Sequence, residues 1–126
     1  MYQAYGLLKP DSDFTLAAAA TKLAARLPDF SIAQDDQRLT LTSEDWEIHL
    51  VLNTGPEVIQ EARTLEEGIG GAEDDLGITS CDRRVEVASD VDDPEMAHFN
   101  DYLTVIEVLK SFRGVIAVDP EEPSLL

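Results

Sequence analysis

The stretch from Asp90 to Pro120 constrains the fold of this chain most strongly. Asp93 suits a helix N-cap, and Pro94 suits the first helical position, where no backbone N–H is needed. Gly114 suits the left-handed residue that follows a helix, and the apolar run at 115–118 predicts a strand covered on both faces and central in a sheet. Between them, helical spacing predicts a helix over 94–112 whose apolar face holds Met96, Phe99, Tyr102, Leu103, Ile106, Leu109 and Phe112.

The remaining patterns predict one α+β domain over residues 1–120 and a C-terminal tail at 121–126. Helical spacing indicates two further helices, at 14–27 and 56–69. Apolar or alternating runs indicate strands at 2–8, 30–33, 38–42, 46–52 and 83–88. The element order is therefore β-α-β-β-β-α-β-α-β. Three consecutive strands imply a meander, so we expect a two-layer sandwich with a mainly antiparallel sheet and its helices on one face.

Composition and local motifs indicate the cellular compartment of the protein. Hydrophobic residues make up 44% of the sequence, a usual share for a globular protein. No apolar run approaches the roughly 20 residues that span a bilayer, and the N-terminus has no signal-peptide pattern. Cys81 is the only cysteine, which excludes an internal disulfide and fits a reducing compartment. We therefore expect a cytoplasmic protein.

Charge is the most unusual global property of the chain. Asp and Glu number 26 against nine Lys and Arg, a net charge of −17. Residues 64–126 hold 16 acidic and four basic residues, so −12 of this charge lies in the second half. Such a surface repels phosphate backbones and anionic lipids, so we expect no nucleic-acid or membrane binding. It favours a basic protein partner, with Glu73, Asp74 and Asp75 as candidate contacts, or it serves solubility alone.

The acidic group Asp90, Asp92, Asp93 and Glu95 deserves comparison with known cation loops. Carboxylates at alternate positions are the ligands that Ca²⁺ or Mg²⁺ needs. An EF-hand loop also needs Gly at its sixth position and Glu at its twelfth, where this chain has Glu95 and Asp101. We therefore predict no metal site here. Phosphate-binding glycine loops, CxxC pairs and HExxH motifs are absent from the sequence, so it predicts no cofactor.

Two hypotheses for chemistry involve Arg83 and Arg84. In the first, these arginines lower the pKa of the Cys81 thiol and His98 serves as its base. In the second, Arg83, Arg84, His98 and Asp101 surround a pocket for an anion or another ligand. The simpler interpretation is a packed cysteine and an ion-pair network that links an arginine to a carboxylate on the last helix.

The C-terminal third also carries a resemblance. Its features are Cys81-Asp82-Arg83-Arg84, the run from His98 to Leu103, and the apolar strand after Gly114. With these, the chain resembles a group of small acidic bacterial proteins of unknown activity, some of them similar to immunity proteins of contact-dependent toxin systems. The resemblance lies mainly in residues 80–120 and includes no catalytic motif. It implies an intracellular protein that binds and neutralises a toxin without chemistry of its own.

Two functional classes follow. The first is a non-catalytic protein-binding module for a basic partner, with an immunity or inhibitor protein as its specific form. The alternative is a small enzyme or ligand-binding domain with a pocket around Arg83, Arg84, His98 and Asp101. A deep pocket lined by those four side chains favours the alternative, and an acidic surface favours the binding module. A third reading, a subunit of a homo-oligomer, requires a large exposed apolar patch.

Overall fold

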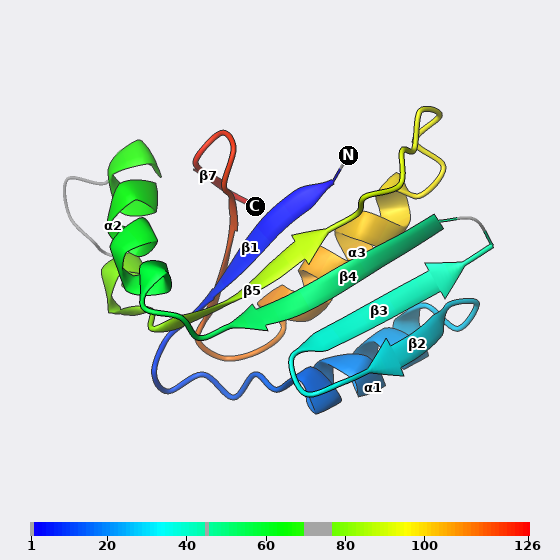
Figure 1. Cartoon of the computed structure of the whole chain (residues 1–126), viewed down its shortest axis with the longest axis horizontal. Helices are drawn as coiled ribbons and strands as arrows, with labels where there is room; N and C mark the ends of the chain where they lie inside the picture. The colour runs from blue at the N-terminus through cyan, green and yellow to red at the C-terminus, as the bar shows by residue number, and fades with distance from the viewer. Residues whose placement is uncertain (1, 45, 70–76) are drawn as a thin grey trace.

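A seven-stranded antiparallel sheet forms the centre of the computed structural model, which describes residues 2–44, 46–69 and 77–126 (Figure 1). The strands lie in the order β2-β3-β4-β5-β1-β6-β7. Their bounds are β1 Gln3–Leu8, β2 Ser31–Gln34, β3 Arg38–Ser43, β4 Trp46–Asn53, β5 Arg83–Ala88, β6 Val115–Asp119 and β7 Ser124–Leu125. The helices in the described residues are α1 Leu16–Arg26, α2 Glu57–Ile69, the short 3-10 helix η1 Ile78–Ser80, and α3 Phe99–Lys110.

The predicted α+β class and the mainly antiparallel sheet are confirmed, and the element order largely matches. The structure adds η1 and β7. Strand β7 lies within the 121–126 segment that the sequence assigns to a tail. There Leu125 pairs with Val118 of β6, and the Leu126 N–H donates to the Ala117 carbonyl at 3.0 Å.

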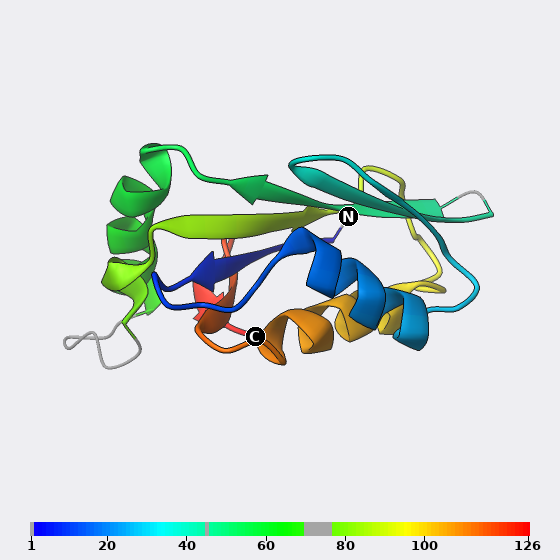
Figure 2. The same cartoon turned by 90° about the horizontal axis from the view of Figure 1, so that it is seen from below.

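The main core lies between the sheet and two helices. Helices α1 and α3 cover the same face of the sheet, as Figure 2 shows. Strand β4 alternates as its sequence predicts, and Trp46, Ile48 and Leu50 are buried in this core. Leu23 of α1 and Leu109 of α3 meet them there. This core sets the position of the N-terminal end of α3, next to the start of β4.

Helix α2 departs from the expected arrangement, because it packs against the opposite face at one end of the sheet (left in Figures 1 and 2). Leu7 of β1 and Val118 of β6 point to that face and contact Ala62 and Leu65 in a second core. The two cores explain the unbroken apolar run of β6, whose alternate residues are covered from opposite sides. Strand β6 is not central, however, since it lies second from the edge.

Helix α3 begins at Phe99, so the predicted start near residue 94 is wrong. Met96 adopts a left-handed φ of 56°, which a continuous right-handed helix does not allow. Residues 93–96 form a turn instead, in which the Met96 N–H donates to the Asp93 carbonyl at 3.0 Å. Met96 is 58% exposed and Leu103 is 39% exposed, so neither belongs to the buried face that the spacing predicts.

The turn after α3 requires glycine, as the sequence predicts. Gly114 has a φ of 73°, and a Cβ there would lie 3.0 Å from the Cα of Ser12. Its carbonyl accepts from the Lys9 N–H at 2.9 Å, which ties the end of α3 to the end of β1. Among the described helices, none has the length and apolar character needed to cross a membrane.

Candidate functional site

The loop between β5 and α3 is fixed to the start of β4. Ser89, at the first position after β5, is fully buried. Its hydroxyl donates to the Glu47 carbonyl at 2.8 Å and contacts the Val91 carbonyl at 3.2 Å, while its N–H donates to the Tyr2 carbonyl at 3.0 Å. The loop therefore leaves the sheet at a defined place, beside Trp46.

Asp93 organises the same loop through three hydrogen bonds. Its carboxylate accepts from the Tyr2 hydroxyl at 2.6 Å and from the N–H groups of Ala97 and His98 at 3.0 and 2.8 Å. Burial raises the pKa of Tyr2 to about 12, and the hydrogen bond to Asp93 and its negative charge act in the same direction. Desolvation raises the pKa of Asp93, but the three donors outweigh it, so the net pKa of Asp93 is lowered.

Trp46 lies beneath this loop in a cluster of rings. The His98 imidazole stacks on its indole, with ring centroids 4.5 Å apart and an interplanar angle of 4°. Tyr2 and Phe30 contact the indole edge-on at 6.1 and 6.2 Å. Trp46 is only 2% exposed, and among the described residues its Nε1 has no hydrogen-bond partner. A buried donor without an acceptor is uncommon in folded proteins and calls for an explanation.

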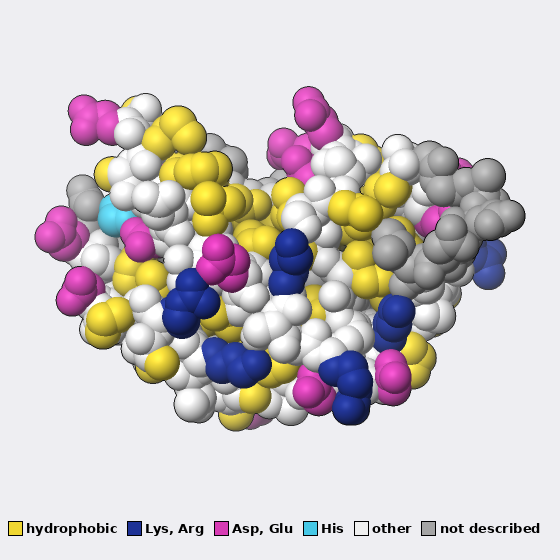
Figure 3. Space-filling view, turned by 180° about the vertical axis from the view of Figure 1, so that it is seen from behind, with side chains coloured by type: hydrophobic (Ala, Val, Ile, Leu, Met, Phe, Trp, Pro, Cys, Tyr) yellow, Lys and Arg dark blue, Asp and Glu magenta, His cyan; other side chains and the backbone are white. Residues whose placement is uncertain are grey.

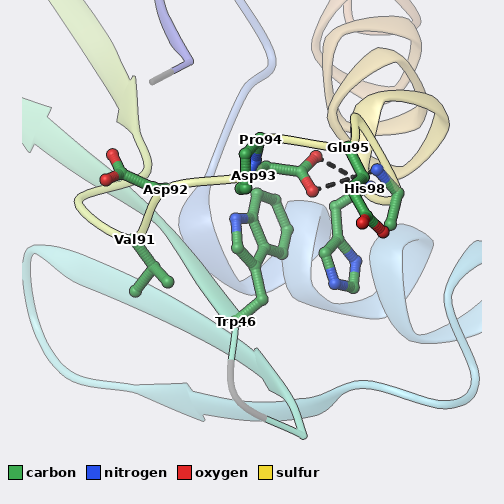
Figure 4. Close-up of a pocket in the computed structure, with 8 residues that line it drawn as sticks. Trp46, Val91, Asp92, Asp93, Pro94, Glu95 and His98 are labelled. Carbon is green, nitrogen blue, oxygen red and sulfur yellow. Dashed lines mark hydrogen bonds between the residues drawn. The ribbon is translucent and has the colours of Figure 1, made fainter.

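A hollow of about 200 Å³ opens above Trp46, and we call it the Trp46 hollow (Figure 4). In Figure 4 the indole lies below the 92–94 segment, with its ring nitrogen turned toward that segment. Asp92 and Glu95 line the hollow and are exposed to solvent. The residues that line it include no Lys or Arg; they are Trp46, Val91, Asp92, Asp93, Pro94, Glu95, Ala97 and His98.

Exposed apolar side chains lie in and near the loop that forms this hollow. Val91, Met96 and Leu103 are three of the six large hydrophobic residues that the described chain leaves exposed. The first two belong to the loop, and Leu103 lies in the first turns of α3. Figure 3 shows hydrophobic side chains gathered at upper left on the helical face, with acidic side chains nearby. An apolar surface with a charged rim is typical of protein-binding sites.

Of the four predicted ligand-binding residues, the structure brings two together. His98 Nδ1 lies 3.0 Å from Asp101 Oδ2, one turn along α3. The Arg84 side chain lies on the opposite face of the sheet, against Glu61 of α2, and its backbone lies opposite Asn53 in the β4–β5 ladder. Trp46, which His98 stacks on, is seven residues from Asn53 along β4, or about 23 Å in an extended strand. The four residues therefore do not share one pocket.

Arg84 is instead the centre of a closed ionic network. It is 5% exposed and forms ion pairs with Glu61 of α2 and Glu86 of β5, the second at 2.7 Å. Its guanidinium also lies 4.3 Å from the centroid of the Tyr5 ring. Burial acts to lower the pKa of Arg84, but the two carboxylates outweigh it and raise that pKa. The expected internal ion-pair network is present. Its carboxylates come from α2 and β5, however, and not from the last helix α3.

The contacts of Arg83 and Cys81 also differ from those that the sequence hypotheses require. Arg83 contacts the Asp82 carboxylate at 3.2 Å and donates to the Lys9 carbonyl at 3.1 Å, and no contact to α3 is found among the described residues. Cys81 is buried in the second core, and its Sγ lies 3.6 Å from the Gly77 carbonyl. His98 lies in the other core region, against Trp46, so it is not placed as a base for Cys81.

The predicted partner contacts Glu73, Asp74 and Asp75 lie outside the described residues. Within residues 2–44, 46–69 and 77–126, no group of three or more His, Cys, Asp or Glu side chains is arranged to hold a metal ion. Comparison with protein-family models, with curated proteins and with solved structures gives no match to this chain.

Sequence reasoning missed Trp46 and Tyr2 as residues of the site. It placed Trp46 correctly on the buried face of β4 and assigned it to the core. One signal was present: the single Trp of the chain begins a strand next to a turn, and a buried indole N–H usually needs a hydrogen-bond partner. The acidic loop that covers it lies 45 residues later, and that proximity depends on the sheet order.

Proposed function

We propose that this chain is a non-catalytic intracellular protein that binds a basic surface of a partner protein, with the Trp46 hollow at the centre of the contact. The Trp46 hollow is the observation that carries this proposal. Its rim carboxylates Asp92 and Glu95 are exposed, and no Lys or Arg is among the described residues that line it. The exposed Val91 and Met96 add an apolar contact area to that rim.

The distribution of charged residues supports the Trp46 hollow as the binding surface for a basic partner. Basic side chains gather on the helical face (Figure 3), where Lys22 and Arg26 belong to α1, and Lys110 and Arg113 lie at the end of α3. Arg26 is paired there with Glu107 at 2.6 Å. These basic residues therefore lie near the C-terminal end of α3, whereas the acidic loop of the hollow precedes its N-terminal end.

A partner of opposite charge gains in its rate of association. Exposed charges are screened beyond roughly 8–10 Å at physiological salt, so they act mainly during the encounter. Rim carboxylates therefore set the association rate and its dependence on salt, while buried contacts set the dissociation rate. An immunity or inhibitor protein that neutralises a basic toxin is the specific form of this function that the sequence resemblance implies.

The test is affinity capture from cells that produce the protein, at graded salt concentrations. Three immobilised proteins are compared: wild type, the rim variant Asp92→Asn/Glu95→Gln, and the control variant Glu121→Gln/Glu122→Gln. The control removes the same two charges from the turn between β6 and β7, at the sheet edge away from β4. We expect wild type and control to retain a basic partner that the rim variant releases at lower salt.

Association kinetics with the purified partner complete the test. We expect the rim variant to associate more slowly than the control, with a weaker dependence on salt and a nearly unchanged dissociation rate. A partner without a basic face, or an association rate that does not change with salt, contradicts the proposal.

A further inference from the structure

The unpaired Nε1–H of Trp46 points to a second chemical requirement of the hollow. This donor is buried and lacks a partner among the described residues, although it belongs to a rigid cluster formed by Tyr2, Phe30 and His98. Asp93 lies in the loop that covers it, yet both of its oxygens already accept from other donors. The hollow therefore has a donor at its floor, and the described residues supply no acceptor for it.

The rim restricts which acceptor can enter. Asp92, Asp93 and Glu95 carry negative charge around the opening, so an anionic acceptor such as a free carboxylate or a phosphate is repelled. A neutral carbonyl oxygen meets no such barrier. The same carboxylates attract a cation, because no Lys or Arg lines the hollow. A single occupant can bind both the Trp46 Nε1–H and the rim carboxylates if it carries a neutral carbonyl beside a positive charge.

We infer that the Trp46 hollow receives a Lys- or Arg-containing segment of the partner protein, with one carbonyl of that segment accepting from Trp46 Nε1–H. The neighbouring basic side chain pairs with Asp92 and Glu95 at the rim. This inference rests on the proposed function, and it specifies the chemistry of the recognised segment. Nε1 is closed to water-sized groups in this structure, so a carbonyl of the partner reaches it only if the 92–94 segment above the indole shifts on binding.

The single Trp of the chain makes the contact directly observable. In a proton–nitrogen correlation spectrum of the full-length protein, the Trp46 indole N–H gives one resonance. The probes are three short peptides with blocked ends: Gly-Arg-Gly, Gly-Lys-Gly and Gly-Gln-Gly. The fourth probe is methylguanidinium, which carries the cation without a carbonyl. Sodium acetate is the fifth, and it supplies an anionic acceptor.

We expect the two basic peptides to move the indole proton resonance downfield in a saturable way. The rim variant Asp92→Asn/Glu95→Gln should bind them about three- to tenfold more weakly, the range for two exposed ion pairs. The control Glu121→Gln/Glu122→Gln should change the Kd less than about twofold. Gly-Gln-Gly and acetate should leave the resonance in place, and methylguanidinium should bind at the rim without moving it downfield.

Three outcomes of the titration with these probes overturn the inference. The first is saturation by a basic peptide with no movement of the indole resonance, and the second is an equal movement with methylguanidinium. The third is a stronger response to acetate than to the peptides. A partner that is captured through Asp92 and Glu95, yet leaves the indole resonance unchanged in the complex, overturns the carbonyl contact and leaves the proposed function standing. Peptide binding without any captured partner overturns the proposed function alone.

Discussion

Arg84 and the Trp46 hollow combine similar groups in opposite ways. Each site has a buried polar group, an aromatic ring and carboxylates. The buried Arg84 guanidinium meets Glu61, Glu86 and the Tyr5 ring, so its charge is neutralised within the chain. In the hollow, Trp46 Nε1 has no acceptor among the described residues, and those that line the hollow beside the rim carboxylates include no Lys or Arg. The first arrangement stabilises the fold, and the second leaves interactions for a partner.

The largest effect should come from Arg84→Ala. Loss of the guanidinium leaves Glu61 and Glu86 close together without their cation and uncovers the Tyr5 ring. We expect the free energy of unfolding to fall by about 2–4 kcal/mol, less than for a fully buried pair because both carboxylates reach solvent. Urea unfolding followed by Trp46 fluorescence measures it. Arg83→Ala is the control and should cost about 1 kcal/mol or less, since its ion pair with Asp82 is partly exposed and Arg83 is less buried than Arg84. Equal losses of unfolding free energy in the two variants would show that the ion pairs of Arg84 stabilise the fold no more than that of Arg83.

His98→Ala should have the next largest effect. It removes the ring stacked on Trp46 and the contact with Asp101. We expect a loss of about 1–2 kcal/mol, from the stacked pair and the space that it leaves. Thermal unfolding by circular dichroism tests this without relying on Trp46 fluorescence. An unchanged stability would mean that the indole needs no support from α3.

Tyr2→Phe should destabilise the fold less than His98→Ala and in a pH-dependent way. The lowered pKa of Asp93 means that its contribution is complete above the ordinary value of 3.8 and is lost as the pH falls through the lowered pKa. The raised pKa of Tyr2 means that its contribution is complete below 10.0 and is lost as the pH rises toward about 12. The stability difference from wild type should be constant at neutral pH and shrink at both extremes. A difference that is independent of pH throughout would contradict the Tyr2–Asp93 hydrogen bond.

Neutralising the rim of the hollow should change stability least. Asp92→Asn/Glu95→Gln should alter the free energy of unfolding by no more than about 0.5 kcal/mol, because both side chains are exposed. The same charge change at the other site, Glu61→Gln/Glu86→Gln, should cost about 1–3 kcal/mol, because Arg84 loses its partners. Urea unfolding of the two variants side by side makes the comparison direct. A loss above about 1 kcal/mol for the rim variant would assign its carboxylates to the fold.

Most of the fold was predictable because its signals are local. The alternation from Trp46 to Leu52 identifies both strand β4 and its buried face. The glycine at 114 reports a left-handed backbone that other residues adopt with strain. The start of α3 was not predictable in the same way, since Asp93 looks like a helix cap from its neighbours. Its carboxylate is held by Tyr2, 91 residues earlier, and the loop closes as a separate turn before the helix.

The two sites depend on which strands become neighbours, and sequence patterns do not contain that order. Arg84 meets Glu61 because α2 packs on the face of the sheet away from α1 and α3. His98 meets Trp46, 52 residues earlier, because β5 pairs with β4 and returns the chain to the start of that strand. Residue types identified His98 and Arg84 as unusual. Their true partners required the sheet topology.

That topology also has a consequence for how the chain folds. Strands β2, β3 and β4 pair with their neighbours in sequence, so this meander can form from local contacts as soon as it is made. Strand β1 is synthesised before the other six strands of this sheet, but it lies between β5 and β6. At usual rates of translation its second partner appears about 6–20 s later. Both edges of β1 stay unpaired until β5 emerges, and one edge stays unpaired until β6 emerges, so we expect the nascent chain to depend on chaperones during that time.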